Sequence, residues 1–450
     1  MNKFLIKSSL VAALGGLLFG FDTAVISGTI NDLVNTFHMS ATSLGVTVSS
    51  ALVGTILGAL LAGVPGERYG RRDSLRIFAV LYFVSAAGCA IAWSWDSLVA
   101  FRIVGGLAIG GSSVLGPMYI AEIAPPKRRG WLVGFFQFNI VLGILSAYFS
   151  NYLIGLAKLG TSEWRWMLGI AAAPAAVFFF MLFGIPRSPR WLAKQSRLDE
   201  ARQVLKMTGE EQFEEELNEI VVSIRVEQQI GRERLFTKQH SLPIFLALSI
   251  GAFNQLSGIN AVLYYLNYIF ASAGFGSVSA NLQAIVVGLT LLVFTVVGML
   301  TIDRLGRRIL LLVGALGTAF CLFGVAVIFS VHRHEELLLW FLVGFIAFFA
   351  FSDGAVIWVY ISEVFPNAVR AKGQSLGSFS HWSMNAIISL LFPMVASFSG
   401  AYPFYFFGAM MLLQFVVVLF FFPETKGISL EEMQNQIIHQ PVLVDPTDCA

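Results

Sequence analysis

Long apolar runs and one long polar interval organise this chain of 450 residues. Residues 8–185 and 243–422 each divide into about six apolar runs, each long enough to span a lipid bilayer as an α-helix. Between them, residues 186–242 hold 20 of the 56 charged residues in the chain. The pattern predicts an all-α membrane protein in which two blocks of six helices are joined by a charged hinge.

The apolar runs give approximate bounds for twelve transmembrane helices. We expect these helices, to within a few residues, at 8–31, 44–66, 74–93, 97–120, 130–154, 166–185, 243–270, 279–300, 309–330, 337–362, 373–397 and 402–422. The chain should therefore consist of a first six-helix bundle (1–185), a cytoplasmic hinge (186–242), a second bundle (243–422) and a cytoplasmic tail (423–450).

Composition supports a membrane protein and argues against several other classes. Charged residues make up 12% of the chain, about half the usual share, and 42 residues are Gly, which lets helices pack closely in lipid. A net charge of +2 without a long basic tract gives no indication of nucleic-acid binding. The three cysteines fit small buried apolar residues better than a metal or redox site. Without a metal cluster or a nucleophile–base motif, we expect neither an enzyme nor a cofactor.

The distribution of basic residues predicts the topology. Cations gather in the hinge and in the loops that follow the second, fourth, eighth and tenth predicted helices, whereas the other loops carry few. By the positive-inside rule, the hinge and both termini of this multi-pass protein should lie on the cytoplasmic side of the cell membrane. The first apolar run, behind Lys3 and Lys7, continues past Asp22 without a clear cleavage site, so we expect an uncleaved first helix.

Three matched signals indicate that the second bundle repeats the first. The sequence Gly-Arg-Arg follows the second and the eighth predicted helices, at positions 70 and 306. Glu122 and Glu363 end the fourth and tenth, and Pro186 and Pro423 end the sixth and twelfth. The separations of 236, 241 and 237 residues are nearly equal. Such a parallel duplication places a substrate at mid-membrane between the halves.

The hinge itself has the pattern of short amphipathic helices. In 188–208, the apolar residues Trp191, Leu192, Val204 and Leu205 stand among charges, and 210–229 places apolar residues at helical spacing. We expect these helices to lie under the bundle, with a docking site for a partner as the alternative.

Five motifs resemble the signatures of the sugar porter family of the major facilitator superfamily. They are GGLLFGFD at 15–22, ERYGRR at 67–72, PRSPRW at 186–191, QLSGIN at 255–260 and PETKG at 423–427. The resemblance runs from the first helix to the twelfth, and it is greatest to bacterial proton–sugar symporters and facilitative glucose transporters. It implies the major facilitator fold.

One acid and one base in the apolar runs are candidates for proton coupling. Asp22 lies midway along the first helix, where a charge costs about 2.5–3.5 kcal/mol and should therefore face a cavity or a partner. Arg102, early in the fourth helix, is the expected partner. A proton switch and a static ion pair that fixes helix packing both remain open. The resemblance favours the switch, because proton symporters of the family have Asp here and facilitators generally have a neutral residue.

A second set of residues has the chemistry that a sugar requires. Amides both donate and accept hydrogen bonds, and aromatic rings cover the apolar faces of a sugar. Gly258 allows local unwinding of the seventh helix, which would turn Gln255 and Asn260 inward together. Amides that join helices and aromatics that fill space are the alternative. The predicted substrate-binding residues are Phe19, Gln137, Asn254, Gln255, Asn260, Tyr264, Trp358, His381, Trp382 and Asn385.

The chain departs from the family at several of these positions. Asn254 precedes Gln255 where the family usually has two Gln, and His381 stands where the similar xylose symporters have Gln. Leu291 replaces an Asn of many sugar-binding members. The identity of the substrate is therefore not carried over. His381 is expected as a neutral hydrogen-bond partner, with a titrating role as the alternative.

Charged residues next to the hinge form two repeat-related sets. Their simplest role is to set topology; the resemblance implies a salt-bridge latch that closes the inner gate and breaks in each cycle, which suits modest, water-accessible pairs. Arg187 replaces the Glu of the family motif and puts the latch of the first half in doubt. The predicted gate residues are Glu67, Arg68, Arg71, Arg72, Glu122, Arg128, Arg190, Asp303, Arg304, Arg307, Arg308, Glu363, Arg370 and Glu424.

These observations together predict a secondary transporter. We expect it to import a monosaccharide, a hexose or a pentose, by proton symport through alternating access. Its partners should be the sugar, the proton and the lipid bilayer, without nucleic acid, and it should function as a monomer. A facilitative uniporter in which Asp22 is structural and a non-transporting sugar sensor are the alternatives.

Overall fold

The computed structural model describes residues 2–125, 128–208, 213–229, 235–366 and 369–426. Within these ranges, twelve helical stretches are long and apolar enough to cross a membrane, as predicted. The first six are α1 (Lys3–Phe37), α2 with α3 (Ala41–Leu61 and Gly63–Arg68), α4 (Arg71–Ala90), α5 (Trp95–Ile123), α6 (Arg129–Ala157) and α7 with α8 (Glu163–Gly169 and Ala172–Met181). The second six are α12 with α13 (Ser241–Leu256 and Ile259–Ser272), α14 (Ser277–Leu305), α15 (Arg307–Val331), α16 with α17 (Leu338–Phe351 and Asp353–Glu363), α18 (Arg370–Phe398) and α19 (Tyr402–Phe421).

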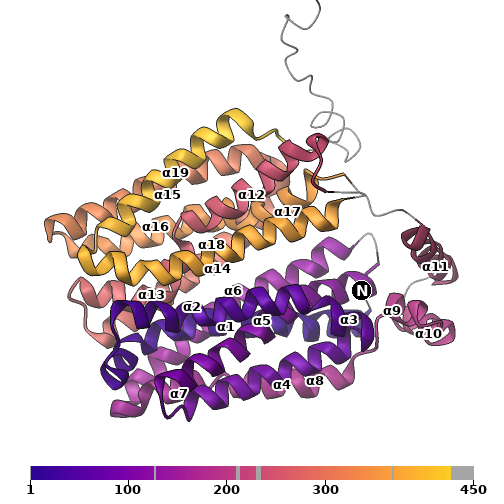
Figure 1. The fold of residues 1–450 in the computed structure, drawn as a ribbon, viewed down its shortest axis with the longest axis horizontal. Helices are drawn as coiled ribbons and strands as arrows, with labels where there is room; N and C mark the ends of the chain where they lie inside the picture. The colour runs from indigo at the N-terminus through magenta and orange to yellow at the C-terminus, as the bar shows by residue number, and fades with distance from the viewer. Residues whose placement is uncertain (1, 126–127, 209–212, 230–234, 367–368, 427–450) are drawn as a thin grey trace, which may run out of the picture.

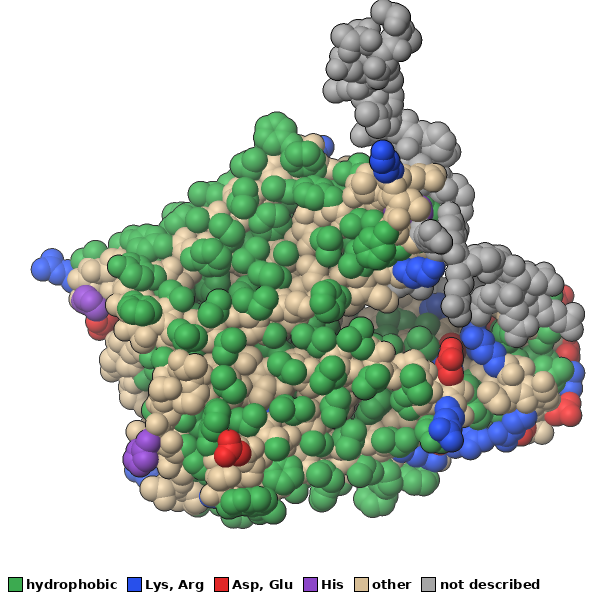
Figure 2. Space-filling model, viewed as in Figure 1, with side chains coloured by type: hydrophobic (Ala, Val, Ile, Leu, Met, Phe, Trp, Pro, Cys, Tyr) green, Lys and Arg blue, Asp and Glu red, His purple; other side chains and the backbone are tan. Residues whose placement is uncertain are grey.

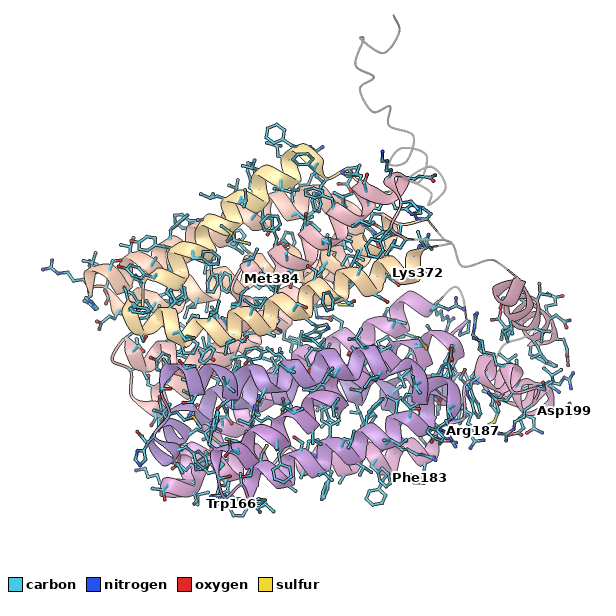
Figure 3. All side chains as sticks on the ribbon, in the orientation of Figure 1. Trp166, Phe183, Arg187, Asp199, Lys372 and Met384 are labelled. Atoms are coloured by element: carbon cyan, nitrogen blue, oxygen red, sulfur yellow. The ribbon has the colours of Figure 1, made fainter. Side chains whose placement is uncertain are left out.

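The spans form two side-by-side bundles, which we call the first half (α1–α8) and the second half (α12–α19). In Figure 1 the indigo to magenta helices of the first half lie below the pink to yellow helices of the second. Three shorter helices, α9 (Pro189–Lys194), α10 (Leu198–Thr208) and α11 (Phe213–Gln229), lie at the end of the bundle where the chain begins. We call this the hinge end. Figure 3 shows Arg187 and Lys372 there and Trp166 at the opposite end.

Small residues bring the helix backbones of the first half into contact. A Cβ atom on Gly20 of α1 would lie 1.8 Å from the carbonyl oxygen of Ile140 in α6. One on Gly106 of α5 would lie 2.0 Å from the carbonyl oxygen of Ala51 in α2. Close approach of this kind is how helices associate in lipid, where apolar burial gives little driving force. Gly20 therefore lets α1, which carries Asp22, pack closely against α6, and Gly106 lets α5 pack closely against α2.

The surface of the bundle matches the membrane that the sequence predicts. Apolar side chains cover the flank of both halves in Figure 2, and the charged side chains gather at the two ends, mostly at the hinge end. Trp166 and Trp340 are exposed at the opposite end, as is typical of aromatic residues at a membrane–water interface.

The helix bounds differ from the predicted ones in a systematic way. Most observed helices begin or end several residues beyond the apolar runs, because polar residues at a membrane surface remain helical. The predicted helix at 337–362 is interrupted at Ser352, whose backbone leaves the helical region (φ −111°, ψ −93°). The apolar run continues across this break, so hydropathy alone could not reveal it.

The hinge helices have a core of their own, which confirms the predicted amphipathic pattern. Trp191, Leu192, Val204 and Leu205 are buried together with apolar residues of α11. The Asn2 side chain donates a hydrogen bond to the carbonyl oxygen of Met207 at 2.7 Å and ties α10 to the start of the chain. Of the predicted tail, residues 427–450 lie outside the described residues.

Candidate functional site

The break in the seventh span is the local feature that builds the site. Gly258 separates α12 from α13 with φ +81°, a left-handed conformation that Gly adopts without strain. A Cβ atom there would also lie 2.3 Å from the ring of Phe407. The predicted unwinding at Gly258 is confirmed, and it places the amides of Gln255 and Asn260 side by side.

Three amides from this break form a continuous hydrogen-bonded chain. Asn260 Nδ2 donates to Gln255 Oε1 at 3.0 Å, and Gln255 Nε2 donates to Asn254 Oδ1 at 3.0 Å. Asn254 Nδ2 reaches the backbone oxygen of Asp353 in α17 at 3.4 Å. Gln255 Nε2 also lies 3.3 Å from each ring nitrogen of His381 in α18. We call Asn254, Gln255 and Asn260 the amide chain; it connects both interrupted spans of the second half.

Aromatic rings surround the buried end of the amide chain. The ring centroid of His381 lies 5.0 Å from that of Trp382 and 5.1 Å from that of Trp358. Trp382 in turn lies 5.5 Å from Phe19, which belongs to the first half. His381 and Trp382 are buried, whereas Trp358 is 39% exposed. The arrangement is a wall of rings with one accessible edge, contributed by both halves.

Tyr264 and Asn385 extend this set of polar groups. Asn385 Nδ2 donates to the Tyr264 hydroxyl at 3.3 Å, and Ser389 Oγ donates to Asn385 Oδ1 at 3.2 Å. Gln137, on α6 of the first half, is half-buried, and no hydrogen bond connects it to the amide chain in the described part of the protein. The structure thus connects the other predicted binding residues through hydrogen bonds, ring contacts or a shared cavity.

The two candidate proton-coupling residues lie close together without direct contact. Asp22 and Arg102 line one cavity of about 10 Å³, which has room for about one water molecule. Arg102 Nε donates to the backbone oxygen of Thr47 at 3.0 Å, and no ion pair joins Arg102 to Asp22 within the described ranges. Tyr264 and Trp382 line the same cavity. The acid, the base and two of the predicted binding residues therefore share one small space.

At the hinge end, the first half contains a charge cluster around Arg71. This buried side chain forms an ion pair with Glu122 of α5 at 2.9 Å and donates to the backbone oxygen of Gly66 at 2.9 Å. Glu122 also accepts a hydrogen bond from Ser188 Oγ at 2.5 Å. Arg187 does not join this pair. Instead it binds Asp73 in the first turn of α4 at 3.0 Å.

The second half has a repeat-related cluster around Arg307. Its guanidinium forms an ion pair with Glu363 of α17 at 2.9 Å, and Thr425 Oγ1 donates to Glu363 at 2.6 Å. The Glu424 carboxylate accepts from the backbone N–H groups of Arg307 and Arg308 at 2.9 and 3.1 Å. We call the two groups the first and second charge clusters; the ion pairs described here each lie within one half.

The remaining predicted gate residues are more peripheral. Asp303 is 81% exposed in its pair with Arg307, and Arg72 pairs with Asp73. The other exposed members of the predicted set are Glu67, Arg68, Arg128 and Arg304. The two remaining members also take part in interactions; they are Arg190 and Arg370.

The two halves are joined by hydrogen bonds toward the opposite end. Ser27 Oγ donates to Asn267 Oδ1 at 3.0 Å and accepts from the Asn267 backbone at 3.0 Å. The Tyr148 hydroxyl donates to the backbone oxygen of Leu263 at 2.9 Å. Figure 2 shows the surface hollowed between the halves at the hinge end, beside basic side chains. The conformation is therefore closed at the opposite end and opens toward the hinge.

Sequence reasoning did not identify three of these features. The contacts of Ser27 with Asn267 come from residues without a distinctive motif. Asp73 lies next to Arg72, but its contact with Arg187 spans a sequence separation of 114 residues. Asp353, by contrast, carries the same signal that pointed to Asp22, namely a single acid within an apolar run.

Comparisons with known proteins agree with this architecture. The sequence profile of the family described as "Sugar (and other) transporter" matches residues 8–437. The chain belongs to this family. It is 38% identical to the D-xylose-proton symporter of Escherichia coli strain K12, with 96% of each chain covered. It is 37% identical to the arabinose-proton symporter of Bacillus subtilis strain 168, with 96% and 95% covered.

The solved structures that match are those of a sugar transporter. The partially occluded inward-open conformation of the xylose transporter XylE from E. coli superposes with a TM-score of 0.85 at 36% identity, over 95% of this chain and 100% of that one. The proton:xylose symporter XylE bound to 6-bromo-6-deoxy-D-glucose gives 0.80 at 36% identity, over 97% and 100%. The chain is thus a twelve-span sugar transporter of the major facilitator superfamily, not an enzyme. By TM-score, its arrangement is more similar to the partially occluded inward-open structure than to the complex with 6-bromo-6-deoxy-D-glucose.

Proposed function

We propose that this protein imports a pentose or hexose by proton symport through alternating access, with the hinge end facing the cytoplasm. The observation that carries the proposal is the cavity in which Asp22 and Arg102 meet the Tyr264 and Trp382 side chains. A proton carrier and a sugar-binding surface that share one space can influence each other directly. The names of the E. coli and B. subtilis relatives, both proton symporters of pentoses, support the same function.

Asp22 carries the proton in this proposal, and Arg102 tunes its charge. When the cavity holds water and opens outward, the positive guanidinium favours the ionised carboxylate. When the halves close, the loss of water disfavours an isolated charge, and Asp22 keeps a proton taken up from outside. The neutral form can then cross the closed state, and the proton leaves once the hinge end opens to water.

The sugar binds against the amide chain and the ring wall. Its hydroxyl groups exchange hydrogen bonds with Gln255 and Asn260, whose amides both donate and accept, and its apolar face lies on Trp382. Gln137 completes the site from the first half when the halves approach. His381 forms part of the wall and contacts Gln255, so it contributes to the choice of sugar.

The charge clusters act at the inner gate. Each cluster fixes the ends of its own helices in the open state through a buried ion pair, and more exposed charges, such as Asp303 and Arg187, surround that pair. These exposed charges can change partners without the cost of moving a deeply buried charge. A contact between the halves at this end would close the gate, and its loss returns the conformation described above.

The decisive experiment measures uptake by purified protein in proteoliposomes. Labelled xylose, arabinose, glucose and myo-inositol are supplied with and without a pH gradient that is acid outside. The wild-type protein is expected to accumulate at least one sugar only with the gradient. Asp22→Asn should still exchange labelled for unlabelled sugar, because the amide mimics the protonated acid, but it should not accumulate sugar.

The matched control is Asp32→Asn, the same substitution on the same helix outside the cavity, which should leave accumulation intact. Gradient-driven accumulation by Asp22→Asn would show that another group carries the proton. If the wild-type protein equilibrates sugar and ignores the gradient, it is a facilitator and Asp22 is structural.

A further inference from the structure

Asp353 is a buried acid that transport through Asp22 does not use. It is the first residue of α17, directly after the break at Ser352, and its side chain is fully buried in the second half. Gln414 of α19, which is also buried, donates from Nε2 to Asp353 Oδ1 at 2.7 Å. The acid and the amide therefore form a hydrogen-bonded pair in the packed interior, next to a helix break.

The pair leaves two buried oxygens without a hydrogen-bond partner. These are Asp353 Oδ2 and Gln414 Oε1, one on each of the two side chains that already share a hydrogen bond. Both are acceptors, and leaving a buried acceptor unpaired costs about 1–3 kcal/mol. Buried polar atoms without partners are rare in folded proteins, so the lack of a hydrogen-bond donor to these two oxygens needs a physical cause. A hydrogen atom on Asp353 Oδ2 would turn this oxygen into a donor, and Gln414 Oε1 is an acceptor that lacks one.

Among the described residues, no cation forms an ion pair with the Asp353 carboxylate. The helices that pack against α17 are α12, α14, α15, α16 and α18, and α19 contributes Gln414. Their charged groups lie at the hinge end, and the interactions of the Asp353 carboxylate with described groups are limited to Gln414. The titratable and charged residues of α17 and these helices are Asp303, Arg304, Arg307, Arg308, Cys321, Tyr360, Glu363, Arg370, Lys372, His381, Tyr402 and Tyr405.

We propose that Asp353 and Gln414 form a proton-binding site in the second half, separate from Asp22, that is occupied at neutral pH. The proton comes from water and binds Asp353 Oδ2, which then donates to Gln414 Oε1. The amide already donates in the other direction, so acid and amide form a reciprocal, neutral pair. An O–H bond of the hydronium ion that supplies the proton breaks as the O–H bond to Asp353 forms, and a water molecule is left; no other covalent bond changes.

The position of the pair gives this proton a role in the binding site. The backbone oxygen of Asp353 accepts from Asn254, the last member of the amide chain. A neutral pair therefore holds the start of α17 in place behind Gln255 and Asn260. Loss of the proton would place a charge in an apolar interior, draw water or a cation toward the break and displace that support.

Infrared spectroscopy of the purified protein at neutral pH tests the proposal directly. The C=O stretch of a protonated carboxyl group is separate from that of a carboxylate, and ¹³C-labelled aspartate assigns it to Asp. The band should be lost in Asp353→Asn and kept in Asp22→Asn. In Gln414→Leu it should move to higher frequency, because the acid C=O loses its donor. A band that Asp353→Asn leaves unchanged, or that Gln414→Leu does not shift, would overturn the proposal.

Thermal unfolding against pH provides a second readout that needs no sugar. A proton bound by the folded state stabilises it at lower pH, and this contribution disappears as rising pH empties the site. The apparent melting temperature of Asp22→Asn should therefore fall as the pH becomes alkaline. The melting temperature of Asp22→Asn/Asp353→Asn should fall less, because the amide at position 353 is a hydrogen-bond donor at every pH. Equal falls in both would contradict the proposal. Both measurements are independent of transport, so their outcome does not depend on symport through Asp22.

Discussion

The two charge clusters at the hinge end occupy repeat-related positions, yet the residues that follow the sixth and the twelfth spans there carry opposite charges. In the second cluster, the Glu424 carboxylate follows the twelfth span and accepts from the N–H groups that begin α15. The position 237 residues earlier is Arg187, which follows the sixth span and binds Asp73. Asp73 itself lies in the first turn of α4, whereas α15 has no acid in its first turn.

The comparison shows that a helix N-terminus needs a nearby negative charge more than it needs a particular residue. The first N–H groups of a helix lack partners within the helix and carry partial positive charge. In α15 an acid from another segment meets this need; in α4 an acid of the helix itself does, and Arg187 balances it. The sequence indicated that Arg187 would weaken the first latch. The structure instead pairs Arg187 with Asp73, which lies 114 residues away in the sequence.

The centres of the clusters are the same in both halves. Arg71 binds Glu122 as Arg307 binds Glu363, and Ser188 and Thr425 donate to these acids. The glycines before the two arginines have nearly equal backbone angles, φ +87° at Gly70 and +90° at Gly306. The duplication therefore preserved the buried pair and changed the more exposed charges around it.

The largest effect is expected at the buried pair of the first cluster. Arg71→Met leaves Glu122 as a buried, uncompensated carboxylate, which should cost about 3 kcal/mol. Arg307→Met should cost less, because Glu363 is more exposed, at 22% against 9% for Glu122. Thermal unfolding in detergent measures both, and Arg71→Met/Glu122→Gln should recover part of the loss. A larger loss in Arg307→Met would reverse the assigned order.

A smaller effect should separate Glu424 from Arg187. Glu424→Ala removes a carboxylate that binds two N–H groups at the start of α15, a loss of about 1–2 kcal/mol. Arg187→Ala removes a partly exposed ion pair, worth about 0–1 kcal/mol. The melting temperatures of the two variants should differ in that order. Equal shifts would mean that Glu424 does not act as a helix cap.

The smallest effect concerns a charge swap that would make the first cluster resemble the second. Arg187→Glu alone should destabilise by up to about 1 kcal/mol, because it places an acid beside Asp73. Arg187→Glu/Asp73→Ile should restore stability, since Ile309 is the repeat counterpart of Asp73 and the new acid can cap α4. Without such recovery, residue 187 cannot take the place that Glu424 has in the second half.

Much of the candidate site was predictable because its chemistry stands out in an apolar sequence. The amides next to Gly258 and the acid at position 22 are conspicuous there, and the break at Gly258 follows from the backbone freedom of Gly. The sequence predicted that Asp22 and Arg102 are partners, and the structure shows that both line one small cavity. Distance and direction of this kind depend on how several helices pack, which no local pattern encodes.

The sequence by itself determined the twelve spans, the repeat and the hinge helices, because each depends on apolar periodicity, chain length or a local breaker. Only the tertiary structure decided which groups meet: Arg187 with Asp73, Gln414 with Asp353, and Ser27 with Asn267. These partners are 61 to 240 residues apart, and their contacts follow from the angles and depths at which helices pack. In a bilayer these are set by small residues and by scarce polar groups that must find one another.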